Sequence, residues 1–243
     1  MVKPKLIHHY VLDVVVAFKL VLWKLNLSNK WRILNVFKVN IMVKQLKIHI
    51  TGMGGQGIGA TSRIISRAAQ LAGYTVMTME THGLAQRGGV VVSDLAIGFD
   101  PTESPICSDG ESDVLIALEA LESVRSLPRL KSDGIVIVNS TIYQPLTVRI
   151  ANGQVASPNM DQILKELHRW TKNVVIVNAF NDSIELGLSQ TMNVILLGAL
   201  ARNLSILPFS EEHIKESIRL NIPRKYHEVN LLAFEKGYNY KVN

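Results

Sequence analysis

Residues 46–57 read LKIHITGMGGQG, and this stretch decides how the rest of the chain folds. Its first half, residues 46–51, is apolar enough to form a buried strand. Its second half fits the pattern G-x-G-x-x-G, in which glycines let the backbone turn tightly and approach a ligand. A helix is predicted next, because small or apolar residues repeat at helical spacing and a glycine follows at the expected end: Ile58, Thr61, Ile65, Ala68, Ala72 and Gly73.

Outward from this unit, apolar segments alternate with amphipathic ones. A β-hairpin turning at Asn152-Gly153 is indicated for residues 146–156. The C-terminal part is expected to be helical, and its first helix, apolar all round, should be buried. The pattern predicts an α/β fold: a Rossmann-like, doubly wound, mostly parallel sheet with a small β-hairpin and a helical C-terminal part. The expected strands are 75–79, 90–98, 113–118, 134–139 and 173–179, and the expected helices are 119–127, 160–170, 192–204, 210–221 and 226–237.

Residues 1–41 differ from the body of the chain. Residues 6–27 are apolar, but a membrane-spanning helix would have to bury Asp13 and Lys19, each at a cost of roughly 2.5–3.5 kcal/mol. A signal peptide would need an uninterrupted apolar region and a small-residue cleavage site, and neither is clear. Met42 opens the segment that leads into the first strand. We therefore interpret residues 1–41 as an N-terminal extension without a role in the fold, with a membrane anchor as the alternative, and residues 42–243 as a single domain.

Composition and charge narrow the class of partner. The chain has 243 residues, of which 47% are hydrophobic and 19% charged, as in a globular protein. The net charge is +6, but residues 1–44 hold eight Lys and Arg against one acid, Asp13. The remainder then has 18 basic and 19 acidic residues, and only 6% of the chain is aromatic. A nucleic-acid partner is therefore not expected.

A single cysteine, Cys107, excludes several kinds of site. One thiol cannot form a disulfide within the chain, which fits a reducing cytoplasm. It cannot hold an iron–sulfur cluster, which normally needs four cysteines, or a cysteine-rich zinc site, so any redox metal must lie on another chain. Cys107 has no His or basic residue beside it in the sequence and is interpreted as an ordinary loop thiol. No metal-ligand spacing is present.

A second group of polar residues follows the strand at 75–79. Residues 81–89 read THGLAQRGG, at the carboxyl end of a strand, where open α/β sheets bind ligands. Arg87 could grip a phosphate or carboxylate with two donors, and His82 could donate to an oxyanion. The alternative is that these side chains only fix the loop. Glu111 and Asp113, at a strand start, are weaker candidates that more often cap or solvate.

Glu80 keeps a different function open. An acid at the end of the second strand is where an NAD-binding domain holds its ribose, so a free-standing NAD(P)-binding dehydrogenase or regulatory module is the alternative function. A third interpretation is that Gly54, Gly55 and Gly57 merely let the helix pack against the strand.

The two loops together resemble the gamma-type domain of 2-oxoacid:ferredoxin oxidoreductases. GMGGQG opens the first helix and HGLAQRGG follows the second strand; the second loop looks most like the indolepyruvate branch. Further similarities are GESDVLIALEALES at 110–123, NVILLGALA at 193–201 and NLLAFEKGY at 230–238. The resemblance covers residues 45–238. Gly59-Ala60-Thr61 departs from it, because larger apolar residues are expected there.

The resemblance implies a small subunit that is inactive alone. The complex would decarboxylate an aryl 2-oxoacid such as indolepyruvate, form an acyl-coenzyme A and reduce ferredoxin. A large alpha subunit would hold thiamine diphosphate, Mg²⁺ and the iron–sulfur clusters, and this chain alone would hold no cofactor. His82 and Arg87 are the candidates for a catalytic role. The residues implied to face the thiamine and coenzyme A cleft are Gly52, Gly54, Gly55, Gln56, Gly57, His82, Gln86, Arg87, Gly88 and Gly89.

Overall fold

The computed structural model describes residues 45–82, 89–143, 158–203 and 207–242. Their centre is one six-stranded sheet with the strand order β2-β3-β1-β4-β5-β6. The first strand of the chain therefore lies inside the sheet, with two later strands on one side and three on the other. The strands are β1 (Leu46–Met53), β2 (Val76–His82), β3 (Val90–Ile97), β4 (Ser112–Ala117), β5 (Leu130–Asn139) and β6 (Val174–Val177).

Five of the six strands run in the same direction, which confirms the predicted mostly parallel sheet. β1, β4, β5 and β6 form parallel pairs, whereas β3 is antiparallel to both β1 and β2. The connection from β2 to β3 explains the reversal, because residues 83–89 are too few for a parallel crossover, which needs roughly a dozen residues or more. β3 therefore returns antiparallel and separates β2 from β1.

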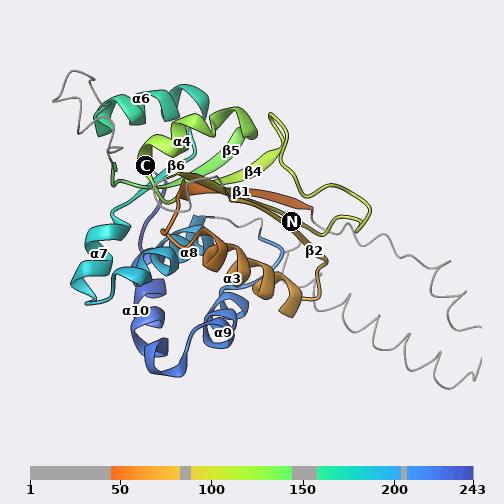
Figure 1. The fold of residues 1–243 in the computed structure, drawn as a ribbon, viewed down its shortest axis with the longest axis vertical. Coiled ribbons are helices and arrows are strands. Elements are labelled where there is room, and N and C mark those ends of the chain that lie inside the picture. Colours follow the sequence, from red (N-terminus) through yellow and green to blue (C-terminus); the bar gives the residue numbers. More distant parts are fainter. Residues whose placement is uncertain (1–44, 83–88, 144–157, 204–206, 243) are drawn as a thin grey trace, which may run out of the picture. The chain divides into compact units, whose positions relative to one another are not determined.

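Helices cover both faces of the sheet (Figure 1). The two faces form separate hydrophobic cores, because alternate residues of each strand point to opposite sides. Ile48 and Ile50 of β1 point to the first core, and Leu115 of β4 to the second. On the first face lie α3 (Ile58–Leu71), α8 (Met192–Asn203), α9 (Glu211–Asn221) and α10 (His227–Tyr238), and on the second lie α4 (Ala120–Arg125) and α6 (Met160–Trp170).

Helix α8 is the buried helix that the sequence predicts. Every residue from Met192 to Leu200 is buried. Its packing against α10 is unusually close, since a Cβ on Gly198 would lie 2.1 Å from the Phe234 carbonyl oxygen. A Cβ on Gly237 would lie 1.9 Å from the Ile195 carbonyl oxygen. Residues 193–201 and 230–238, the two C-terminal segments that carry the family resemblance, therefore form one closely packed helix pair. This packing requires glycine at both positions.

Some boundaries differ from the sequence-based expectation. Helix α6 begins and ends where predicted, but β2 runs on through His82, so residues 80–82 belong to a strand and not to a loop. Helix α7 (Ala179–Glu185) was not predicted. The expected hairpin at 146–156 and the extension at 1–41 lie outside the described residues, so the division into extension and domain stays a prediction.

Within the described residues, no helix is both long and apolar enough to span a bilayer.

Candidate functional site

The glycine loop lies between the carboxyl end of β1 and the first turn of α3. Gly55 and Gly57 have φ angles of 98° and 82°, a left-handed conformation that L side chains rarely adopt. Gly57 is also the N-cap of α3, where the first amides of a helix have no intrahelical partner. After β1 the chain adds β2 and β3 on one side of that strand and then crosses to add β4 on the other. The loop therefore lies at a topological switch point, a common position for ligands.

Gln56 closes the loop with its own side chain. Its Oε1 accepts a hydrogen bond of 2.7 Å from the Met53 amide, and its backbone amide donates to the Met53 carbonyl at 3.1 Å. Gly52 makes room for this arrangement, since a Cβ there would lie 2.7 Å from Oε1. The Nε2 of Gln56 is buried and has no partner among the described residues. A buried donor without an acceptor is costly, so this amide is suited to bind a ligand or partner group.

Asn193 holds the loop from the opposite side. It belongs to α8, is 8% exposed, and donates from Nδ2 to the Gly57 carbonyl at 3.2 Å. A Cβ on Gly57 would lie 2.3 Å from that nitrogen. No sequence motif marks Asn193, because an amide within an otherwise apolar helix gives no sign of its partner 136 residues away.

The two sequence motifs meet in space. Val91 of β3 lies opposite Gly52 on one side and His82 on the other. The amide of Gly54 donates to the Gly89 carbonyl at 2.8 Å. The carboxyl end of the second loop, Gly89, is therefore next to the glycine loop, while His82 lies one strand further away, across β3. Gln86, Arg87, Gly88 and the side chain of His82 lie outside the described structure, so their roles stay predictions.

A cavity of about 570 Å³ adjoins the glycine loop. Its described lining contains no Asp, Glu, Lys, Arg, His or Cys, so these residues offer neither a carboxylate nor an imidazole for proton transfer. Tyr143 and Phe180 meet edge to face there, with ring centroids 6.3 Å apart. The lining is largely apolar or amide-bearing: Gly55, Gln56, Gly57, Ala60, Tyr143, Phe180, Leu188, Ser189, Gln190, Met192, Asn193, Ile222, Pro223, Tyr226 and Asn230.

A buried carboxylate anchors the Tyr143 side of this cavity. Glu119 is 1% exposed, and its carboxylate accepts from the Glu122 amide at 2.8 Å and the Tyr143 amide at 3.0 Å. Burial raises the pKa of Glu119. Burial, together with the Glu119 carboxylate, also raises the pKa of Tyr143. Tyr143 is therefore a neutral hydroxyl at physiological pH and not a phenolate.

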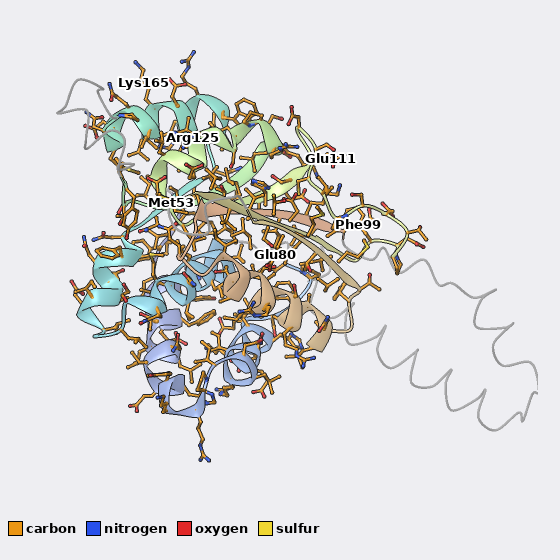
Figure 2. The ribbon with its side chains drawn as sticks, in the orientation of Figure 1. Met53, Glu80, Phe99, Glu111, Arg125 and Lys165 are labelled. Atoms are coloured by element: carbon orange, nitrogen blue, oxygen red, sulfur yellow. The ribbon has the colours of Figure 1, made fainter. Side chains whose placement is uncertain are left out.

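Glu80 lies on the other side of the loop, over the first turns of α3 (Figure 2). A Cβ on Gly59 would lie 3.1 Å from the Glu80 carboxylate and 3.4 Å from the Arg63 guanidinium. The absence of a side chain at Gly59 thus leaves room for these two side chains. In a dinucleotide-binding sheet the acid-bearing strand lies beside β1, whereas here β3 separates the two. This topology disfavours the NAD interpretation.

The acids at the start of β4 lie at the opposite end of the sheet from Met53 (Figure 2). Glu111 pairs with the Lys47 ammonium at 2.6 Å, and Asp113 accepts from the Lys47 amide at 2.8 Å. Both acids therefore contact Lys47 near the start of β1, away from the glycine loop.

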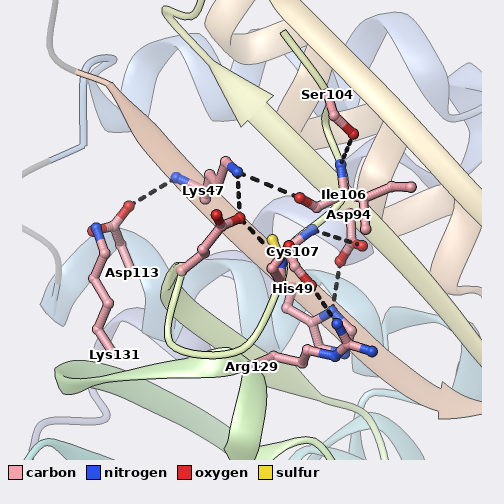
Figure 3. A network of polar contacts seen from close by, with 11 residues as sticks. Lys47, His49, Asp94, Ser104, Ile106, Cys107, Asp113, Arg129 and Lys131 are labelled. Carbon is pink, nitrogen blue, oxygen red and sulfur yellow. Dashed lines mark hydrogen bonds and ion pairs between the residues drawn. The ribbon is translucent and has the colours of Figure 1, made fainter.

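Cys107 has no His or basic residue beside it in the sequence, but the fold brings both kinds of residue next to it. It is fully buried beside His49 and Asp94, and Arg129 binds its carbonyl (Figure 3). Burial raises the pKa of the Cys107 thiol.

Comparison with known sequences follows this geometry. The sequence signature of the family described as pyruvate ferredoxin/flavodoxin oxidoreductase matches residues 47–240. The indolepyruvate oxidoreductase subunit IorB of Archaeoglobus fulgidus is 39% identical over 199 residues, covering 82% of this chain and 96% of the relative. The 2-oxoglutarate synthase subunit KorC of Methanocaldococcus jannaschii is 26% identical over 193 residues, covering 79% and 91%.

A solved structure has the same fold. The pyruvate oxidoreductase subunit PORC of Thermotoga maritima superposes with a TM-score of 0.58 at 23% identity. The alignment covers 82% of this chain and 98% of that one. At this identity the likeness concerns the fold alone.

Proposed function

Because this chain belongs to the pyruvate ferredoxin/flavodoxin oxidoreductase family, we propose that it is the small subunit of a 2-oxoacid:ferredoxin oxidoreductase acting on aryl pyruvates such as indolepyruvate. The complex decarboxylates the oxoacid, transfers the acyl group to coenzyme A and passes electrons to ferredoxin in the cytoplasm. A large subunit is its partner. The chain contributes a binding surface and is inactive alone.

The hydrogen bond between Gly54 and Gly89 is the observation that carries this proposal. It joins the two loops on which the family resemblance depends into one site at the carboxyl edge of the sheet. Either glycine-rich loop alone would fit many nucleotide-binding proteins. Their direct contact, beside a cavity of about 570 Å³, supports one shared surface for a cofactor or substrate held by the partner.

The indolepyruvate branch is favoured by the degree of similarity. The chain is 39% identical to the Archaeoglobus indolepyruvate subunit but 26% identical to the Methanocaldococcus 2-oxoglutarate subunit, over similar lengths. The cavity agrees with an aromatic group, because Tyr143, Phe180 and Tyr226 line it and the described lining carries no charge. An aryl side chain loses little solvation in such surroundings, whereas the second carboxylate of 2-oxoglutarate would lose much.

The described residues fit a binding role toward thiamine diphosphate and coenzyme A. Gly55 leaves open space, since nothing lies within 4 Å of a Cβ built there, and the Gln56 Nε2 is a buried donor without a partner among the described residues. The first amides of α3 and this Nε2 would hold an anionic or carbonyl group of the cofactor. Thiamine diphosphate supplies the carbanion chemistry when bound. The iron–sulfur clusters belong to the large subunit, because one thiol cannot hold them.

The experiment that tests this proposal asks whether the purified full chain binds a large thiamine-binding subunit or a dinucleotide. We expect the large thiamine-binding subunit of the same organism to form a stable complex with it in size-exclusion chromatography. We expect neither NAD⁺ nor NADP⁺ at 1 mM to raise its melting temperature, because β3 separates the acid-bearing strand β2 from β1. Stabilisation by a dinucleotide without complex formation would overturn the proposal in favour of the dehydrogenase.

A further inference from the structure

A second chemical cluster lies on the other face of the sheet, away from the glycine loop. His49 of β1 and Asp94 of β3 are register partners on adjacent strands. His49 alternates with Ile48 and Ile50, which point to the core beneath α3, so it points to the opposite face. His49 Nδ1 and Asp94 Oδ1 lie 2.5 Å apart. The two side chains are 5% and 7% exposed, so neither is a surface group.

The loop that carries Cys107 is fixed against this pair (Figure 3). Its amide donates to Asp94 Oδ2 at 3.1 Å, and Arg129 donates to its carbonyl at 2.8 Å. Lys47 donates to the preceding carbonyl, that of Ile106, at 3.3 Å. Three hydrogen bonds therefore hold two residues of backbone. The Cys107 side chain, fully buried, is presented to His49 and Asp94 by a preorganised loop.

We propose that His49, Asp94 and Cys107 form a binding site for one divalent transition-metal ion of the zinc type. Their ligand atoms all lie within 4.8 Å of one another. Imidazole nitrogen, thiolate sulfur and carboxylate oxygen are together typical of zinc sites, whereas Mg²⁺ and Ca²⁺ prefer oxygen ligands alone. The site lies outside the glycine loop and does not depend on the proposed function.

The geometry needs only a small adjustment. With metal–ligand distances of roughly 2.1 Å, tetrahedral nitrogen and oxygen ligands stand about 3.4 Å apart, so the His49–Asp94 contact of 2.5 Å must open by about 1 Å. The Cys107 sulfur, which lies within 4.8 Å of both, must come to about 3.6 Å from each. Cys107 releases its thiol proton to solvent, and the imidazole proton moves from Nδ1 to Nε2, so the ring stays neutral. One carboxylate and one thiolate then balance the divalent charge. The bond from the Cys107 amide to Asp94 Oδ2 can persist.

Three protein ligands leave a fourth position for water or an external ligand. A cavity of about 590 Å³ reaches His49 and Asp94 and could supply it. This cavity opens over β2 and β3 and is lined by both apolar and charged residues: His49, Met79, Thr81, Val90, Val92, Asp94, Ile106, Asp109, Glu122, Arg125, Ser126, Pro128 and Arg129. An open position makes the ion exchangeable, unlike one in a closed four-ligand site.

The rival explanation is a buried hydrogen-bond network that binds no metal, and Co²⁺ titration of the reduced full chain separates the two. We expect one equivalent of Co²⁺ to bind, with thiolate-to-cobalt absorption in the near ultraviolet and the visible bands of a tetrahedral ion. Zn²⁺ should displace it. Because the readout is metal binding by the isolated subunit, its failure leaves the proposed function untouched.

Variants assign the ligands. Cys107→Ser should abolish the thiolate band, and His49→Gln and Asp94→Asn should each weaken Co²⁺ binding at least tenfold. His168→Gln, an exposed histidine on α6, is the matched control and should bind as the unmodified chain does. Absence of the thiolate band at saturating Co²⁺ in the unmodified chain would overturn the proposal, whether or not the variants fold. Retention of the band in Cys107→Ser would do the same.

Discussion

The amide of Gly54 donates a hydrogen bond of 2.8 Å to the carbonyl of Gly89. This bond joins the end of β1 to the start of β3, two positions that lie 35 residues apart in the chain. It ties the glycine loop to the residue that precedes β3, at the carboxyl end of β1. A substitution in the glycine loop should therefore affect the second loop, and the reverse.

Two glycine substitutions in the glycine loop should lower the free energy of unfolding by different amounts. Gly55→Ala should lower the unfolding free energy by roughly 1–2 kcal/mol, the cost of a left-handed conformation for an L residue, because its Cβ would meet open space. Gly57→Ala should cost more, because its Cβ would also displace Asn193. Urea denaturation measures both.

Gly110→Ala is the matched control, because Gly110 has a φ of 71° and open space around its Cβ but lies away from the loop. It should resemble Gly55→Ala in stability and leave turnover of the complex unchanged. Equal stability losses for Gly55→Ala and Gly57→Ala would contradict the role given to Asn193.

Gln56→Glu distinguishes the structural role of the Gln56 oxygen from the binding role of its nitrogen. Glutamate keeps an oxygen to accept the Met53 amide, but it loses the buried Nε2 donor that has no partner among the described residues. The chain should fold but lose some stability, because a carboxylate oxygen replaces a buried amide nitrogen. Turnover of the complex should fall by roughly 10²-fold, the scale for losing one positioned donor. Gln70→Glu, exposed on α3, serves as control. Unchanged turnover would mean that Nε2 contacts nothing important in the complex.

The sequence was sufficient for the order of elements but not for the strand order. Hydrophobic spacing located β1, α3 and the buried helix α8, because each has a strong period or composition. The insertion of β3 between β1 and β2 follows from a short connection, and spacing alone does not give the direction of a strand. Helix α7 begins only two residues after β6, and its first residue, Ala179, falls inside the strand expected at 173–179.

Arg87→Ala tests the second loop. A guanidinium there suits a phosphate or carboxylate of the bound cofactor or substrate, so turnover of arylpyruvate should fall by roughly 10²-fold or more while assembly stays intact. Arg87→Lys should recover only part of the lost turnover, since an ammonium cannot donate two parallel hydrogen bonds as a guanidinium does. Steady-state kinetics of the reconstituted complex give the comparison.

Arg219→Ala, on the exposed face of α9, is the control for removing a positive charge. Full turnover in Arg87→Ala would make the loop structural. Loss of complex formation would instead make Arg87 an interface anchor and would remove it from the cleft.

Deletion of residues 1–41 should leave the domain folded. Within the described residues the sheet begins at Leu46, and the strand–loop–helix unit that organises the fold follows from there. The truncated chain should keep its melting temperature within a few degrees in differential scanning calorimetry. A large loss of stability, or insolubility of the truncated chain, would contradict this prediction.

Candidate site residues were predictable only where they are close in the sequence. Gln56 stood out because it lies inside a glycine pattern. Asn193 did not, because its partner Gly57 is 136 residues away, and neither did His49 and Asp94, which are 45 residues apart. Pairing of β1 with β3 creates the second contact, and no local motif announces such a pair.

The most direct test of the central claim is steady-state reduction of ferredoxin by indolepyruvate and coenzyme A, measured with the large subunit alone, with this chain alone, and with both. We expect that neither chain alone reduces ferredoxin at an appreciable rate and that the two together do so, with formation of the aryl acyl-coenzyme A. Ferredoxin reduction by the large subunit at the same rate without this chain would contradict it.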